Sequence, residues 1–228
     1  MSFKEYIFPE ICSLCKENKI YDDSYICETC YKELEFTSNE SCKLCSANID
    51  SFLDVCNQCI ENKRPWSRGF APLVFKGQSR EAIHKFKYNS QLVISRLLVK
   101  LMVDSLMNYG IHDFSCITSV PMHWTKKIRR GFNQAEILAS GIAKNLRIPY
   151  KDLLIRKSQS SAQALKNKSQ RKSNIRQIFK INEKQKVPDG AILLVDDVLT
   201  TGTTLTACSK ALLENGAREI CIITAARG

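Results

Sequence analysis

The stretch ILLVDDVLTTGTTL, residues 192–205, decides the fold because it joins an apolar run, two adjacent carboxylates and a Thr/Gly-rich turn. The run at 192–195 is short and wholly apolar, which is typical of a buried strand in a parallel sheet. Asp196 and Asp197 follow this run, and a helix is expected from about residue 204. The stretch therefore predicts a strand, a binding turn and a helix in succession.

The rest of the body, residues 65–228, repeats this alternation of short apolar runs and helical periodicity. Further strands are predicted at 72–76, 115–121 and 219–225, after a linker at 61–70. Helices are predicted at 78–88, 91–108 and 204–215, and Asn133 can cap another helix whose apolar stripe consists of Ala135, Leu138, Ala139, Ile142 and Leu146. This order predicts an α/β fold, in which helices flank both faces of a parallel sheet.

The turn after the two carboxylates has the features of a phosphate site at the carboxyl end of a strand. Backbone N–H groups, a helix dipole and hydroxyl donors favour an anion at Thr200, Thr201, Gly202, Thr203 and Thr204. Asp196 and Asp197 need a different partner, either sugar hydroxyls or Mg2+. Ribose 5-phosphate satisfies both halves. Adjacent carboxylates also occur in magnesium sites of receiver domains and phosphatases, but the TTGTT that follows favours the sugar phosphate.

Residues 1–64 hold eight cysteines in four CxxC pairs: Cys12 and Cys15, Cys27 and Cys30, Cys42 and Cys45, and Cys56 and Cys59. Two such pairs present four thiolates to one tetrahedral zinc ion. No export signal is recognisable, and in a reducing cytosol a disulfide framework is disfavoured. We therefore predict a small N-terminal module, residues 1–64, with two structural Zn2+ ions. Sequential pairing in two stacked ribbons is favoured, and a cross-braced pairing of the same cysteines stays open.

The formal net charge of +11 is unevenly distributed along the chain. Residues 1–64 carry 7 Lys and Arg against 12 Asp and Glu, a net charge of −5, whereas residues 65–228 carry 27 against 11, a net of +16. A basic body implies anionic partners such as phosphates, nucleotides or nucleic acid, and a solubility surface is the plain alternative. No apolar run approaches the ~20 residues of a membrane span, so a cytoplasmic location is expected.

Two basic segments are candidates for binding polyanions. The stretch MHWTKKIRRGFNQ, residues 122–134, is expected to be a loop at the phosphate-binding edge, with the cations Lys126, Lys127, Arg129 and Arg130. Residues 153–182 contain eight Lys and Arg, among them Arg171 and Lys172, and no Asp or Glu. The alternatives are a solvated surface run for the first segment and a disordered loop for the second. Trp124, Phe132 and Phe86 are the aromatic candidates for stacking on bases.

The motif VDDVLTTGTT at 195–204 resembles the loop with which type I phosphoribosyltransferases bind 5-phosphoribosyl 1-pyrophosphate (PRPP). Together with the four CxxC pairs, IHKFKY at 83–88 and KKIRRGFNQAE at 126–136, it makes essentially the whole chain resemble the competence protein F (ComF, ComFC or GntX-like) family. The resemblance implies a type I phosphoribosyltransferase-like domain at 65–228 behind a double zinc ribbon.

The same resemblance implies roles for individual residues. Asp196 and Asp197 would contact the ribose hydroxyls, and the 5-phosphate would bind at Thr200, Thr201, Gly202, Thr203 and Thr204. Ser119, Val120 and Pro121 would belong to the loop on the pyrophosphate side, and the basic residues named above would bind pyrophosphate or DNA. The segment within 153–182 matches the position of the flexible loop that closes over PRPP in this superfamily.

Two functions are compatible with these features. In the first, a ComF-like competence protein binds PRPP with Mg2+ and single-stranded DNA, and acts in natural transformation on the cytoplasmic side with a helicase or another DNA-processing protein as partner. In the second, an active phosphoribosyltransferase acts on a base or amine acceptor, for which no recognition element is visible. The uneven charge favours the first function.

Overall fold

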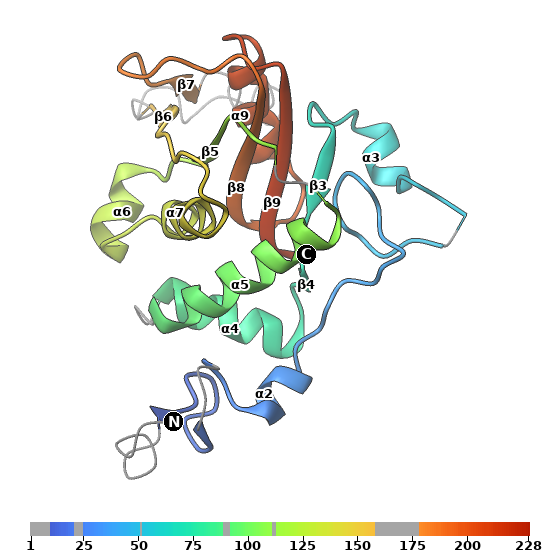
Figure 1. The fold of residues 1–228 in the computed structure, drawn as a ribbon, viewed down its shortest axis with the longest axis vertical. Helices are drawn as coiled ribbons and strands as arrows, with labels where there is room; N and C mark the ends of the chain where they lie inside the picture. The colour runs from blue at the N-terminus through green and yellow to red at the C-terminus, as the bar shows by residue number, and fades with distance from the viewer. Residues whose placement is uncertain (1–9, 21–24, 51, 89–91, 111–112, 158–177) are drawn as a thin grey trace, which may run out of the picture.

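The computed structural model describes residues 10–20, 25–50, 52–88, 92–110, 113–157 and 178–228 (Figure 1). Its centre is a five-stranded sheet in the order β3-β9-β8-β5, in which all neighbours are parallel and β4 pairs with the end of β9. The strands are β3 (Arg68–Phe70), β4 (Leu73–Val74), β5 (Cys116–Ser119), β8 (Ala191–Leu199) and β9 (Glu219–Arg227). The predicted parallel sheet is confirmed.

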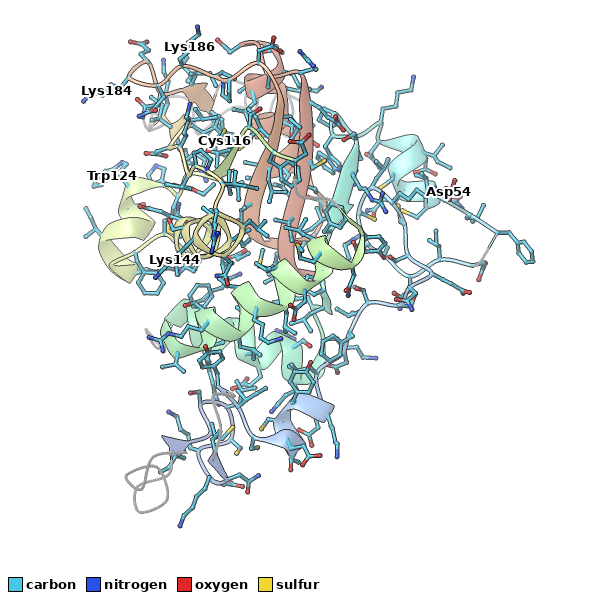
Figure 2. All side chains as sticks on the ribbon, in the orientation of Figure 1. Asp54, Cys116, Trp124, Lys144, Lys184 and Lys186 are labelled. Carbon is cyan, nitrogen blue, oxygen red and sulfur yellow. The ribbon has the colours of Figure 1, made fainter. Side chains whose placement is uncertain are left out.

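Helices cover both faces of the sheet, as predicted, because its central strand β8 is apolar on both sides. Leu193 and Val195 pack on one face and Ile192 and Leu194 on the other, and all four are fully buried. The first face is covered by α4 (Gly77–Tyr88), α5 (Leu92–Asn108) and α7 (Gln134–Leu146), and the second by α9 (Thr203–Leu213). The interior position of Cys116 on β5 is visible in Figure 2.

Three segments differ from the sequence-based expectations. The expected linker at 61–70 contains strand β3, which pairs with β9 at the edge of the sheet. The expected basic loop contains a short helix, α6 (Trp124–Arg130). Strand β8 runs on to Leu199 instead of ending at residue 195, because its register with β9 continues past the two carboxylates.

A pair of short strands was also not predicted. An antiparallel pair, β6 (Leu154–Arg156) with β7 (Phe179–Ile181), flanks the basic segment. The core of that segment, including Arg171 and Lys172, lies outside the described residues. The two described ends of the segment, at β6 and β7, therefore lie side by side.

The first four cysteines form a lobe that packs on α4. Its elements are β1 (Glu10–Ile11), β2 (Lys19–Ile20) and α2 (Glu28–Lys32). The lobe contributes Ile26 and Leu34 to the same apolar cluster as Phe86 of α4. Gln78 of α4 also donates a side-chain hydrogen bond to Sγ of Cys30, at 3.4 Å. This lobe therefore shares its core with the sheet domain.

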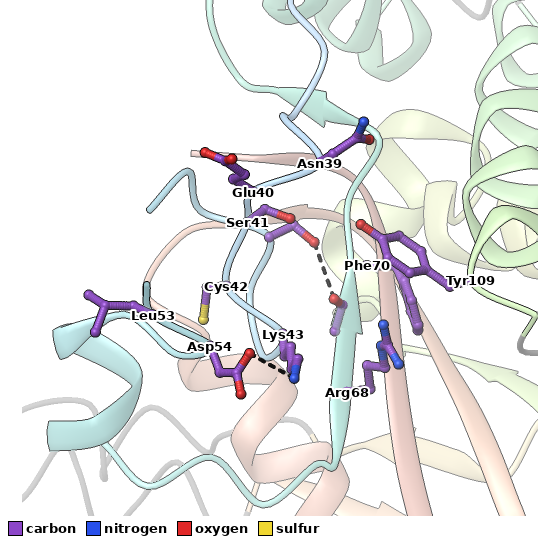
Figure 3. Close-up of a pocket in the computed structure, with 12 residues that line it drawn as sticks. Asn39, Glu40, Ser41, Cys42, Lys43, Leu53, Asp54, Arg68, Phe70 and Tyr109 are labelled. Atoms are coloured by element: carbon purple, nitrogen blue, oxygen red, sulfur yellow. Dashed lines mark hydrogen bonds and ion pairs between the residues drawn. The ribbon is translucent and has the colours of Figure 1, made fainter. Parts of the chain in front are cut away.

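The second four cysteines form another lobe, with the helix α3 (Asn57–Glu61), which docks on the edge strand β3. Trp66 is buried beside this lobe and donates from its indole N–H to the carbonyl of Leu44 at 2.7 Å. Ser46 Oγ bonds the carbonyl of Gly69 and accepts from the N–H of Ala71. Figure 3 shows the surface beside this junction, where Lys43 and Asp54 form an ion pair.

The two lobes do not stack on each other, which corrects the expectation of two stacked ribbons. They contribute to different apolar clusters, one on each face of the sheet. In Figure 1, α4 lies between α2 and the sheet, whereas α3 lies beside β3. The two lobes lie apart because each covers a different apolar surface of the body.

The close contact at Gly69 gives a test of how the second lobe is attached. An added Cβ at this position would lie 2.2 Å from the carbonyl oxygen of Leu44. We expect Gly69→Ala to lower the free energy of unfolding in urea by about 1–3 kcal/mol, since the lobe must shift off the sheet edge. Gly110→Ala is the control, because a Cβ there meets nothing within 4 Å although φ is +64°. A smaller loss of unfolding free energy in Gly69→Ala than in Gly110→Ala would contradict the close contact.

Candidate functional site

The carboxyl ends of β5, β8 and β9 meet at one edge of the sheet because the three strands are parallel. The N–H of Val120 donates to the carbonyl of Val195 at 2.9 Å, which places the end of β5 level with Asp196. Asp196 in turn pairs in register with Thr224 of β9. The residues predicted at the ends of β5 and β8 therefore come together at the edge where ligands bind in folds of this kind.

The carboxylates of Asp196 and Asp197 differ in their surroundings. The N–H of Asp197 donates to Oδ1 of Asp196 at 2.8 Å, and Lys87 Nζ forms an ion pair with Oδ2 of Asp197 at 3.0 Å. The side chains of Lys87 and Asp197 are only 18% and 19% exposed. Lys87 belongs to the motif IHKFKY, but no local pattern in that motif indicates that it faces the acidic pair.

Burial of its carboxyl, together with the nearby charge of Asp197, raises the pKa of Asp196 to about 8. The residue as a whole is partly exposed, so the enclosure concerns the carboxyl and not the entire residue. The neighbouring Lys87 acts in the opposite direction but does not offset the burial. A ligand that brings positive charge or hydrogen-bond donors would stabilise the ionised form of this carboxyl.

The Thr/Gly-rich loop projects beyond the end of β8 into solvent. Thr200, Thr201 and Thr203 are exposed. Gly202 is buried, has a φ of +75° and stands at the N-cap of α9. A left-handed residue at this point turns the chain sharply into the helix, a conformation that glycine adopts without strain. The loop therefore offers hydroxyls and a helix N-terminus to an anion.

Two arginines that were not among the predicted site residues donate hydrogen bonds to the backbone of this loop. Arg227, at the end of β9, donates to the carbonyls of Leu199 and Thr200 at 3.2 and 3.1 Å. Arg64 donates to the carbonyl of Thr201 at 2.9 Å. The two arginines are distant from the loop in sequence, and no local pattern indicated this contact.

The residues after β5 are fixed by side chains of the motif RRGFNQAE. Asn133 donates to the carbonyl of Val120 at 3.1 Å and caps α7 by accepting from Ala135 N–H. Gln134 is buried and reaches the carbonyl of Lys87 at 3.4 Å. The motif thus joins α7 to the end of β5 and to the helix that carries Lys87.

Ser119 itself is buried at the end of β5, and its hydroxyl lies 3.0 Å from that of Tyr150. Burial raises the pKa of Tyr150 to about 12, although the hydrogen bond with Ser119 opposes this. Ser119 and Val120 therefore form the floor of the site, and Pro121 continues from it at partial exposure.

The basic helix α6 begins four residues after β5 ends. The structure describes its backbone, whereas the side chains of Lys126, Lys127 and Arg129 lie outside the described residues. Arg130 is directed to Gln134, with 3.3 Å between Nη1 and Oε1. Trp124 is 57% exposed and lies on the outer edge of the molecule in Figure 2.

Of the three aromatic residues proposed for base stacking, Trp124 is the accessible one. Phe86 is fully buried, and Phe132 packs against it with 6.1 Å between ring centroids. Two of the three candidates therefore serve the core.

Each group of four cysteines is arranged for one metal ion. The ligand atoms of Cys12, Cys15, Cys27 and Cys30 lie within 4.8 Å of one another, and the same holds for Cys42, Cys45, Cys56 and Cys59. The Sγ atoms of Cys15 and Cys27 are 3.9 Å apart and those of Cys45 and Cys56 are 3.6 Å apart. Tetrahedral zinc–thiolate bonds of 2.3 Å require about 3.8 Å between sulfurs. The pairing is therefore sequential, and the cross-braced alternative is wrong.

Backbone N–H groups point at the sulfurs, as thiolate ligands require. The N–H of Cys27 lies 3.3 Å from Cys12 Sγ, and that of Cys56 lies 3.3 Å from Cys42 Sγ. Desolvation raises the pKa of Cys27, but hydrogen bonds from Asn18 and from the backbone at Cys30 outweigh it and take the value to about 6. The donor set of both groups suits Zn2+.

Two parts of the chain match family models of known domains. Residues 3–68 match the family model for the double zinc ribbon domain, and residues 130–228 match that for the phosphoribosyl transferase domain. None of the helices in the described part of the chain is long and apolar enough to traverse a bilayer.

Similarity also extends along most of the chain. Competence protein F of Haemophilus influenzae is 27% identical over 92% of this chain and 93% of its own. DNA utilization protein YhgH of Escherichia coli is 26% identical over 93% of this chain and 94% of its own. A purine phosphoribosyltransferase of Pyrococcus horikoshii matches 57% of this chain and 70% of its own, with 18% identity and a TM-score of 0.36.

The raised pKa of Asp196 predicts how stability responds to pH. The pKa lies near 8 when folded and near ~3.9 when unfolded, so the stability from this carboxyl is full at low pH and is lost as pH rises toward 8. The measurement is the free energy of unfolding in urea without Mg2+ or ligand. Relative to wild type, we expect Asp196→Asn to gain more than about 1 kcal/mol of this free energy as pH rises from 5 to 8. Asp54→Asn, at an exposed carboxylate, is the control. Parallel pH profiles for Asp196→Asn and wild type would contradict the enclosure of this carboxyl.

Proposed function

We propose that this chain, a homologue of the ComF competence proteins with a phosphoribosyltransferase domain and a double zinc ribbon, acts in DNA uptake as a protein that binds PRPP with Mg2+. The observation that supports this most directly is the arrangement at the end of β8. The acidic pair and the exposed loop follow one another at the edge where β5 also ends. One ligand with a diol and a phosphate spans both features.

The loop is suited to the 5-phosphate of PRPP. Thr200, Thr201 and Thr203 are exposed, and the hydroxyls of Thr201 and Thr203 lie 2.9 Å apart. Gly202 brings the backbone close to the ligand, and Thr204 extends the set of donors into the first turn of α9. The length of α9, 11 residues, gives this N-terminus a full helix dipole.

The acidic pair is suited to the ribose hydroxyls and to Mg2+. Each ribose hydroxyl can donate to a carboxylate oxygen, and this exchange would release Lys87 from Asp197. The freed lysine would then be a cation beside a ligand that carries several negative charges. Ser119, Val120 and Pro121 provide the pyrophosphate side of the same edge.

The two cysteine groups are proposed to hold structural Zn2+. Both lobes are small, and each contributes its apolar residues to the core of the body instead of forming a core of its own. Metal binding would therefore supply folding free energy that such short segments cannot obtain from apolar burial.

Turnover of PRPP is the second candidate function. A ribosyl cation forming at this edge would be stabilised by the acidic pair, and nearby cations would hold the departing pyrophosphate. No described residue identifies a base or amine acceptor, so the binding role is preferred. Pyrophosphate release from PRPP, measured with candidate acceptors and with and without DNA, discriminates between the two roles.

Single-stranded DNA is the proposed macromolecular ligand, on the cytoplasmic side and with a helicase or another DNA-processing protein as partner. The net charge of +16 at residues 65–228 supports it, since phosphate contacts dominate such binding. Helix α6 offers Trp124 for stacking, next to the basic residues Lys126, Lys127 and Arg129.

The PRPP proposal predicts selective loss of affinity. We expect Asp197→Asn and Thr203→Val each to weaken PRPP binding in the presence of Mg2+ about 10- to 100-fold, since each removes a charge-assisted or phosphate hydrogen bond worth about 1–3 kcal/mol. Isothermal titration calorimetry measures the change. Asp189→Asn is the control, because Asp189 is exposed before the amino end of β8. Unchanged affinity in both site variants would overturn the proposal.

The DNA proposal predicts two separable effects in filter binding across a salt series. Replacing Lys126 and Lys127 with Ala should flatten the log–log salt dependence by roughly one to two units, at ~0.7 per phosphate contact on single strands. Trp124→Ala should weaken binding about 10-fold without changing the slope, because stacking releases no counterions. Replacing the exposed Lys184 and Lys186, which precede β8 at the opposite edge, is the matched control. Equal effects of the two lysine pairs would place the DNA elsewhere.

A further inference from the structure

We propose that the second cysteine group positions the Thr/Gly-rich loop at residues 200–204, with Arg64 and Arg227 as the connecting residues. Arg227 contacts Gln58 of the second lobe, and Arg64 lies over Trp66, which is anchored to that lobe. Both arginines donate to backbone carbonyls of residues 199–201. Zinc bound by the second group would then set the affinity of the loop for a phosphate. This inference rests on the proposed binding of PRPP.

Arg227 joins three parts of the molecule. Its Nη1 donates to the carbonyls of Leu199 and Thr200, and its Nη2 donates to Oε1 of Gln58 at 2.8 Å. Gln58 lies inside the CxxC pair of Cys56 and Cys59. One side chain at the end of β9 therefore joins the second CxxC pair of the second group to the start of the loop.

Arg64 makes the corresponding contacts on the other side. It donates to the carbonyl of Thr201, and an added Cβ on Gly202 would lie 2.6 Å from its Nη1. The guanidinium carbon also lies 5.3 Å from the centre of the Trp66 ring. Because Trp66 is anchored to Leu44, between Cys42 and Cys45, the position of Arg64 depends on the second lobe.

The charges are arranged to favour this link. Four thiolates around Zn2+ carry a net charge of about −2. Arg64 and Arg227 bring two positive charges to the side of this lobe, and their Nη1 groups donate to the carbonyls of the loop.

The direction of the peptide groups explains how this affects a phosphate. In a trans peptide the C=O and the following N–H point in opposite directions. The arginines hold three consecutive carbonyls, those of Leu199, Thr200 and Thr201, on the side of the second lobe. The N–H groups of the next residue in each case, 200–202, are thereby turned to the opposite side. Three aligned N–H groups form an anion-binding concavity.

The first cysteine group has no such link among the described residues. Its contacts run to α4, through Gln78 to Cys30 and through Lys85 to the carbonyl of Leu14. The two zinc sites should therefore respond differently when the loop is occupied.

The wild-type protein provides the primary test. Zinc transfer to a chromogenic chelator should occur in two phases, and PRPP with Mg2+ should slow one of them at least about fivefold, because a loop held by both the ligand and the arginines disfavours opening of the second lobe. Cys56→Ser should remove the protected phase, which assigns it to the second group. If PRPP binds but slows the release of neither zinc ion, the inferred link between the second cysteine group and the loop is overturned, and the proposed function is not. Absence of PRPP binding overturns the proposed function and this inference with it.

The arginines are tested separately. Arg64→Gln and Arg227→Gln should still contain two zinc ions, bind PRPP about tenfold more weakly and lose the protection of the second zinc. Arg218→Gln, at an exposed arginine paired with Asp189, is the matched control and should behave as wild type. Wild-type affinity and protection in both arginine variants would overturn the roles of Arg64 and Arg227. Where a variant does not fold, the zinc-transfer experiment on the wild type decides.

Discussion

The central constraint in this structure is the presence of two adjacent carboxylates at the end of a strand that is buried on both faces. Asp196 is enclosed and Asp197 is paired with Lys87, so their charge is balanced within the protein before any ligand binds. Lys87 lies on α4, and α4 is held by the first cysteine lobe and by Gln134 of α7. The acidic pair is therefore supported by three elements that cover the same face of the sheet.

The two cysteine lobes contribute to the body in different ways. The first packs on α4, the helix whose Lys87 pairs with Asp197. The second covers the edge strand β3 and is joined to the Thr/Gly-rich loop by Arg64 and Arg227. Neither lobe has a separate apolar core, because its buried residues belong to the clusters of the sheet domain. Metal binding, docking and the geometry of the site are thereby connected.

Much of this could be predicted from sequence, because the decisive signals are local. The alternation of apolar runs and helical stripes gave the parallel sheet, and strand–loop–helix order put Asp196 and Gly202 at its carboxyl edge. The hairpin β6–β7 was missed because three-residue strands are too short for a periodic signal. Helix α6 was missed because its charged residues outweigh its two apolar ones, Trp124 and Ile128, which are both exposed.

The sequence by itself determined the fold class, the eight cysteines of the two candidate metal sites and the acidic and glycine-rich motif, since each consists of residues that are neighbours along the chain. Only the tertiary structure decided which cysteines share a site, that the lobes lie apart, and that Lys87, Arg64 and Arg227 reach the binding edge. Arg64 and Arg227 are more than 130 residues from at least one of their partners. Such contacts arise from packing in three dimensions, and a one-dimensional pattern carries no record of them.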